Sequence, residues 1–380
     1  MRLIFEELKK LFTVKTIILI SIVSFIMYQQ FIMFDFKHFP NGRPLLDTFL
    51  ATQKMLEDYG ETMDEDEFED FKDIYEKRID EATAYIKSHN ELAAAGIDTY
   101  KEFRSMDLED EKLSALHHKV VFEDFVDVFW EIQAREVMID TYEHPERFSQ
   151  YGPGELNEKQ EARIHELVEN GATTAVFTYL VFENYNTLIK VVAIMIFLSV
   201  MLVLMPLYVG DKRNHAIFLQ YTSKVGRSLF TKKLVAGLIA SLTVITIHLS
   251  CFFFLYAGND TSMFFPLTIN SIYNNFVSWY DITFFQYIVF TVICIYLLGI
   301  ALVLVAACIS SIAPNYMTSV GLHVPLAFIL FGLGTSYLVQ NITIVYLPQH
   351  LVPISLVIIL LICALLYGWR YRNEKVRDIA

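Results

Sequence analysis

Several signatures of enzymes are missing from this sequence of 380 residues. No G-x-x-x-x-G-K-[ST] segment occurs, so the chain has no P-loop with which to bind and hydrolyse ATP. The H-E-x-x-H zinc motif, a glycine-rich dinucleotide turn and the G-x-S-x-G nucleophile elbow are absent too. We therefore expect no catalytic residues, no metal site and no directly bound cofactor.

Cysteine is scarce and unevenly placed. The four cysteines are Cys251, Cys294, Cys308 and Cys363, and all of them fall in apolar runs. Residues 35–187 contain none, so a disulfide framework is excluded there, and C-x-x-C metal-ligand spacing is absent from the whole chain. A domain in that segment must be stabilised by its core alone. If it lies outside the cell, this favours a bacterial protein.

Charge is absent from a long stretch and concentrated in another. The 88 residues of 282–369 include no Asp, Glu, Lys or Arg. In contrast, residues 35–187 hold 36 of the 43 acidic residues against 15 of the 30 basic ones, a net charge of −21. The rest of the chain carries a net charge of +8, so the net charge of the whole chain is −13. With 54% hydrophobic residues, the sequence predicts several membrane spans and one acidic domain.

The predicted fold is an all-α integral membrane protein with six transmembrane helices and a mostly helical domain inserted between the first two. A run of about 20 apolar residues is needed to cross a bilayer. The expected segments are an amphipathic helix (1–15), span one (16–34), the acidic domain (35–187), span two (188–209), an inner segment (210–233), span three (234–256), an outer loop (257–281), span four (282–310), span five (318–339), span six (351–369) and a tail (370–380).

Helical periodicity is clear at two places. In the N-terminal segment the apolar residues recur at helical spacing, and these are Ile4, Leu8, Leu11 and Phe12. We expect the charged residues to lie on the other face, and these are Glu6, Glu7, Lys9 and Lys10. In the acidic domain one apolar stripe consists of Phe68, Phe71, Tyr75, Ile79, Ala82 and Ile86.

The positive-inside rule predicts the orientation. Of the 15 basic residues outside the acidic domain, 14 lie in segments that share one side of the membrane. The exception is Lys190. We therefore expect a multi-pass protein of the cell membrane, with both termini cytoplasmic and the acidic domain extracytoplasmic.

The inner segment 210–233 is too polar to span a membrane and too short to form a domain. It contains an apolar triplet, Ile217, Phe218 and Leu219, with Tyr221 close by. One interpretation is a basic loop that lies on anionic lipid. The other is a short helix that docks into a cytoplasmic partner and transmits its motion.

The order of segments, together with L-x-x-T-S-x-x-G-R-x-x-x-x-x-K in this stretch, resembles the permease subunits of ABC-2 type exporters. That family has an acidic residue, an apolar pair, a Ser/Thr turn, a Gly/Arg pair and a lysine in corresponding places. The matching residues here are Asp211, Phe218 with Leu219, Thr222 with Ser223, Gly226 with Arg227, and Lys232 or Lys233. The family's usual Glu-Arg-Glu start is here Asp-Lys-Arg, and the outer domain is larger than in compact members.

The resemblance implies that 210–233 holds a coupling helix and that 1–15 is an elbow helix. The coupling residues would be Asp211, Phe218, Leu219, Tyr221, Thr222, Gly226 and Arg227. It also implies a cytoplasmic ABC ATPase that uses ATP–Mg, a second permease subunit, identical or related, and contact with membrane lipid, but no nucleic acid. A cationic peptide or antibiotic, or Na⁺, would be the substrate.

A dense acidic run in the outer domain suggests a second site. It includes Glu61, Asp64, Glu65, Asp66, Glu67, Glu69 and Asp70. Such a surface concentrates cations or cationic peptides, so one hypothesis is capture of a cationic substrate. The alternative is a solvated helix face. The run lacks the glycine of an EF-hand loop, which argues against specific calcium binding.

Two histidines, His248 and His323, lie in apolar runs. Because ionisable groups at membrane depth are costly, we expect each to be hydrogen-bonded to a neighbouring helix. Two rival functions remain. A sensor or scaffold would bind a ligand through the acidic domain, but the chain has no sizeable inner output domain. An ion-coupled carrier would need buried carboxylates, and the clearly apolar spans have none.

Overall fold

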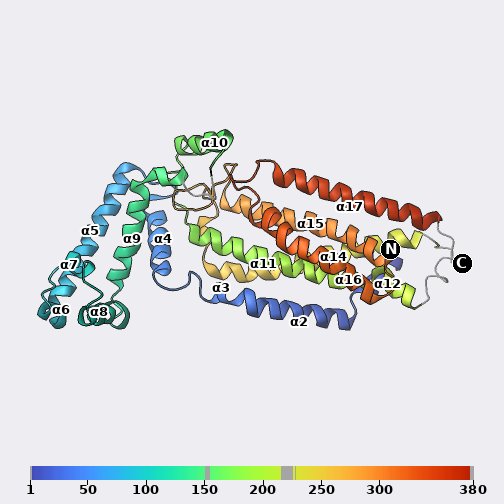
Figure 1. Cartoon of the computed structure of the whole chain (residues 1–380), viewed down its shortest axis with the longest axis horizontal. Helices are drawn as coiled ribbons and strands as arrows, with labels where there is room; N and C mark the ends of the chain where they lie inside the picture. Colours follow the sequence, from blue (N-terminus) through green and yellow to red (C-terminus); the bar gives the residue numbers. More distant parts are fainter. Residues whose placement is uncertain (1, 150–154, 215–225, 227, 377–380) are drawn as a thin grey trace. The chain divides into compact units, whose positions relative to one another are not determined.

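The computed structural model describes residues 2–149, 155–214, 226 and 228–376. Within these ranges the regular elements are helices, with isolated β-bridges at Thr62–Ala175 and Thr268–Thr283. The chain forms two compact units (Figure 1). One comprises residues 1–37, 184–263 and 285–380, and the other comprises residues 38–183 and 264–284.

Six helices in the described residues are long and apolar enough to cross a membrane. They comprise α2 (Val14–Phe31), α11 (Tyr179–Leu204) with α12 (Pro206–Arg213), α14 (Ser228–Tyr256) with η3 (Ala257–Asn259), α15 (Phe284–Ile312), α16 (Tyr316–Ile329) with η5 (Leu330–Gly334) and η6 (Ser336–Gln340), and α17 (Leu351–Val376). The expected all-helical class with six apolar helices is confirmed. Figure 1 shows the long helices α2, α11, α15 and α17 running roughly parallel.

The helices extend beyond the predicted spans at several ends. Helix α12 continues to Arg213, and α14 already begins at Ser228, so only residues 214–227 separate them. At the N-terminus, α1 (Arg2–Leu11) precedes α2, and α3 (Met33–Lys37) follows it. Thr13 caps α2, because its side chain accepts a hydrogen bond from the backbone N–H of Thr16.

The second unit is built mainly from α4 (Leu45–Tyr59), α5 (Glu65–Ser88) and α9 (Asp127–Glu143), which pack side by side (Figure 1). Shorter elements complete it: α6 (Asn90–Ala94), α7 (Tyr100–Arg104), α8 (Glu111–His118), η1 (Lys119–Glu123), η2 (Pro145–Ser149), α10 (Glu158–Glu169) and η4 (Ser262–Phe264), the last of which begins in the first unit. The predicted stripe on α5 is confirmed, because Phe68, Phe71, Ala82 and Ile86 are buried.

The predicted outer loop contributes to this unit. Residues 264–284 belong to the same compact unit as residues 38–183. The backbone N–H of Ile272 donates to the carbonyl of Ala172 at 3.0 Å, and the hydroxyl of Ser271 donates to the carbonyl of Ala175 at 2.5 Å. Ile272 and Tyr273 share a buried cluster with Phe71 and other residues of the unit. The domain is therefore made from two separate stretches of chain.

Candidate functional site

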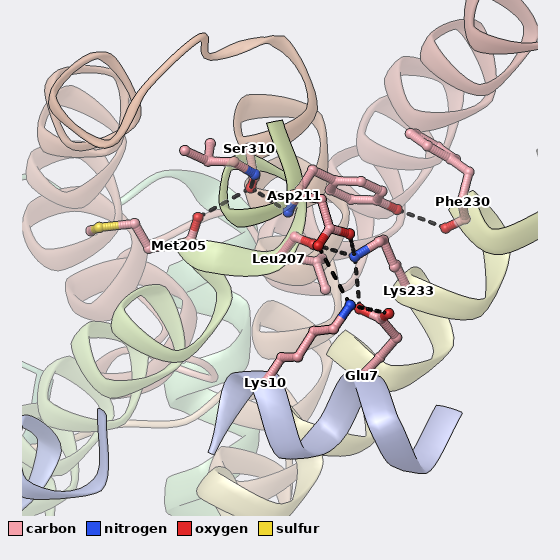
Figure 2. Close-up of polar contacts among 10 residues, drawn as sticks. Glu7, Lys10, Met205, Leu207, Asp211, Phe230, Lys233 and Ser310 are labelled. Carbon is pink, nitrogen blue, oxygen red and sulfur yellow. Dashed lines mark hydrogen bonds and ion pairs between the residues drawn. The ribbon is translucent and has the colours of Figure 1, made fainter. Parts of the chain in front are cut away.

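The site begins at a helix break. Pro206 ends α11, because proline has no N–H and its ring disturbs the preceding turn. The polar groups at this break find partners on α14 and α15. The hydroxyl of Ser310 donates to the carbonyl of Met205 at 3.1 Å and accepts from the backbone N–H of Tyr208 at 3.0 Å (Figure 2). Lys233 donates to the carbonyl of Leu207 at 3.1 Å. The break is therefore fixed by side chains from two other helices.

Four charged side chains meet beside this break, and Figure 2 shows them converging from α1, α12 and α14. The Nζ of Lys233 lies 2.7 Å from an oxygen of Glu7 and 2.5 Å from an oxygen of Asp211. The Nζ of Lys10 lies 2.7 Å from Glu7 and 3.4 Å from Asp211. Each cation therefore contacts both carboxylates. We call Glu7, Lys10, Asp211 and Lys233 the four-charge cluster.

The four-charge cluster is shielded from solvent on one side only. The side chains of Lys233 and Glu7 are 4% and 6% exposed, whereas that of Lys10 is 50% exposed. Partial burial lowers the pKa of Lys10, but its hydrogen bond to Glu7 and its attraction to Asp211 outweigh burial and raise that pKa above its ordinary value. Lys10 is therefore held in its charged form.

A second set of contacts joins the end of α15 to its neighbours. Lys212 donates to the carbonyl of Ser311 and, at 3.1 Å, to that of Ala313. Arg370 of α17 donates to the Ser311 hydroxyl at 2.8 Å and to the Ser311 carbonyl at 3.3 Å, and it pairs with Glu374. The last carbonyls of a helix lack partners within it and carry partial negative charge, so two cations are suited to them.

These contacts converge on the base of the inner segment. Asp211 and Lys212 lie in the last turn of α12, which ends at Arg213. The two residues join α12 to different neighbours. Asp211 links α12 to α1 and α14, and Lys212 links α12 to α15. Asp211 and Lys212 thus connect α12 to three other helices.

The predicted coupling residues fall into two groups. The structure places Asp211 in the four-charge cluster and gives Gly226 a positive φ of 50°, a conformation suited to glycine. The other predicted residues, Phe218, Leu219, Tyr221, Thr222 and Arg227, lie outside the described residues. Of the two lysines considered for the start of the third span, Lys233 is the buried one.

The predicted N-terminal helix forms, but one residue was assigned to the wrong face. Leu11 is buried, and Ile4, Leu8 and Phe12 are half-buried. Glu7 was expected on the polar face and is instead 5% exposed, against α14. The prediction failed because its partner, Lys233, is 226 residues away in the sequence. Local periodicity carries no information about so distant an ion pair.

The acidic run of the second unit is largely a solvated helix start. Asp64 and Glu67 form a reciprocal capping box at the N-terminus of α5, where negative charge is favoured. Glu69 pairs with Lys72, and Asp70 accepts a hydrogen bond from the Tyr59 hydroxyl at 2.8 Å. The other members, Glu61, Glu65 and Asp66, are exposed. Among the described residues, no group of three or more His, Cys, Asp or Glu could hold a metal ion.

The two histidines differ in their partners. His248 contacts Ser24 of α2 at 3.0 Å, so its predicted hydrogen bond to a neighbouring helix is confirmed. The Nδ1 of His323 instead contacts the carbonyl of Ser319, four residues earlier in its own helix, at 2.8 Å. A buried histidine in a helix can therefore satisfy one nitrogen without a neighbouring helix.

Sequence reasoning missed Glu7, Lys10, Ser310, Ser311 and Arg370 as parts of this region. One sequence feature marks Lys233: it is the last charge before the apolar run of α14, where a cation needs a counter-ion. Comparison of the chain with family models, curated proteins and solved structures gives no match.

Proposed function

We propose that the chain is the membrane-spanning permease subunit of an ATP-driven exporter of the ABC-2 class. It would pair with a second permease and be driven by a separate cytoplasmic ATPase that uses ATP–Mg. Six apolar helices and the resemblance of residues 211–233 to that family support the proposal. In it, both termini lie in the cytoplasm, the acidic unit lies outside the cell, and a cationic peptide, an antibiotic or Na⁺ is exported.

The four-charge cluster is the observation that carries the proposal. A coupling segment must be mechanically connected to the spans, since a force applied to a loose loop would be lost. Here Asp211 precedes residues 214–227 and Lys233 follows them, and the two side chains are 2.5 Å apart. Both ends of the segment are thus joined to each other and to Glu7 of α1. Docking of the segment on an ATPase would move these helices together.

The first test is co-purification. We expect the full chain, purified in mild detergent from its native host, to retain an ATPase of the P-loop class. Phe218→Asp should abolish the association, because a carboxylate cannot fill an apolar groove on the partner. Phe125→Asp is the matched control, because Phe125 is a 69% exposed phenylalanine of the outer unit. It should leave the complex intact.

Two outcomes would contradict the proposal. One is purification of the chain with no ATPase. The other is equal retention of the ATPase by the Phe218→Asp variant and the wild type. A complex with a signalling protein instead of an ATPase would favour the sensor or scaffold.

A further inference from the structure

A cavity of about 560 Å³ lies between α2, α11 and α14, within the first unit. Its walls are mostly hydrocarbon side chains, for example Ile17, Ile20, Val192, Met195 and Ile247. The described residues that line it include no Asp, Glu, Lys or Arg. Its volume is in the range of small-molecule sites, roughly 300–1,000 Å³. Ions and charged peptides are poor occupants for such walls.

The cavity extends along most of α2. Along α2 its lining residues recur every three or four positions from Ile17 through Ser24 and Tyr28 to Ile32. At 1.5 Å per residue, this stretch is roughly 20–25 Å long. This cavity, which we call the slot, is therefore long and apolar, as the binding site of a hydrocarbon chain must be.

Two of the residues that line the slot, Ser24 and His248, are joined by a hydrogen bond. The Nδ1 of His248 lies 2.8 Å from the carbonyl of Val244, which can only accept, so we assign the proton to Nδ1. The Nε2 then accepts from the Ser24 hydroxyl at 3.0 Å. This bond joins α2, which has no buried residue, to α14. It satisfies the ring within the protein and leaves the slot walls apolar.

One end of the slot has a basic residue beside it. Lys15 is exposed and lies between Phe12 and Ile17, which both line the slot. Lysines at a membrane surface attract anionic lipids. The apolar slot and Lys15 together match an acyl chain that carries a negatively charged headgroup.

We propose that this slot is a binding site for one acyl chain of an anionic membrane phospholipid, with its phosphate beside Lys15. The bound chain would fill the space between α2 and α14 and stabilise their spacing. This proposal is independent of the exporter function, because it uses none of the residues of the four-charge cluster or of the inner segment.

Cys251 provides a natural reporter for the test. It lines the slot and is exposed, whereas Cys294, Cys308 and Cys363 are buried. The full chain in delipidated detergent would be treated with a lipid-soluble maleimide, and labelling of Cys251 would be followed by mass spectrometry. We expect phosphatidylglycerol to slow labelling about fivefold more than phosphatidylcholine of the same chains, and Lys15→Gln to remove this difference.

A matched pair of variants tests the position of the chain. Ser21→Phe fills the slot from α2 without touching the hydrogen bond of His248, whereas Ile22→Phe adds the same ring at a 51% exposed position outside the lining. Protection by phosphatidylglycerol should be lost in the first variant and kept in the second. Thr243→Phe, which fills the slot from α14, should act like Ser21→Phe if the latter does not fold.

Several results would overturn the proposal. These are absence of protection by phosphatidylglycerol, equal protection by phosphatidylcholine, and equal effects of Ser21→Phe and Ile22→Phe. Efficient cross-linking of two copies through Cys251 would instead assign this face to contact between copies.

Discussion

At the scale of single residues, Lys233 connects both carboxylates of the four-charge cluster. Its ammonium group contacts the carboxylates of both Glu7 and Asp211, and its side chain is only 4% exposed. Breaking a buried ion pair by removing one partner is much more costly than replacing the whole set, because an uncompensated charge stays buried. Lys10 cannot substitute for it, since that side chain is half exposed.

We therefore predict that Lys233→Met lowers the free energy of unfolding by about 3–5 kcal/mol, measured by thermal unfolding in detergent. Lys232→Met is the control, because Lys232 is adjacent but only half-buried. Adding Glu7→Gln and Asp211→Asn to Lys233→Met should recover much of the loss, since no buried charge then lacks a counter-ion. An unchanged unfolding temperature for Lys233→Met would show that the four-charge cluster is not needed for stability.

The sequence could predict only part of this site. Asp211 and Lys233 stand out because they flank a polar segment between two apolar runs. Glu7 does not, because in a short helix its charge places it on the solvent face, and only the fold brings it to Lys233. The contact between Arg370 and Ser311 could not be predicted either, because the two residues are 59 positions apart and only the fold brings them together.

At the scale of helices, one close approach depends on a glycine. A Cβ added at Gly299 of α15 would lie 2.5 Å from the Cδ1 of Ile245 on α14. Such a distance is shorter than carbon atoms tolerate, so the two helices approach closely because Gly299 has no side chain. Small residues at helix crossings are typical of membrane bundles.

We expect Gly299→Val to destabilise the helix bundle by about 1–3 kcal/mol, through overpacking against Ile245. Gly321→Val in α16 is a matched control, because no atom lies within 4 Å of a Cβ built there. Both changes alter intrinsic helix propensity equally, so the difference between their unfolding temperatures reports the contact alone. Equal effects would argue against the close approach.

Helix identity was easier to predict than helix ends. The stripe on α5 was readable because its period of three to four residues extends over six positions, from Phe68 to Ile86. The break at Pro206 could not be predicted, because Met205 and Leu207 continue the apolar pattern on both sides. Hydropathy likewise does not mark the start of α14, because Ser228 to Lys233 are polar or mixed yet helical.

At the scale of the whole chain, the distribution of charge predicts which side of a membrane each part occupies. We expect a cysteine placed at Asp66 to react with a membrane-impermeant maleimide in intact cells. A cysteine at Arg372 should react only after permeabilisation. Both positions are exposed, so burial does not explain a difference between them. The reverse pattern would place the acidic unit in the cytoplasm and would contradict the proposed docking role of residues 214–227.

The second unit also shows why a domain boundary is hard to predict from composition. Residues 257–281 were expected to form an outer loop. In the second unit, 80 residues of largely apolar chain separate residue 183 from residue 264. Nothing in the local sequence indicates that Ile272 hydrogen-bonds to Ala172. This hydrogen bond forms because the helices between the two residues bring residue 272 back to residue 172.

This two-part construction imposes an order on biosynthesis. The ribosome completes residues 38–183 well before it reaches residues 264–284, which supply Ser271 and Ile272 to the same unit. At typical rates of roughly 5–20 residues per second, the interval is on the order of 4–16 seconds. During that time Ala175 and Val176, buried in the finished protein, lack their final cover. The second unit therefore cannot complete its folding until two more apolar helices have been synthesised.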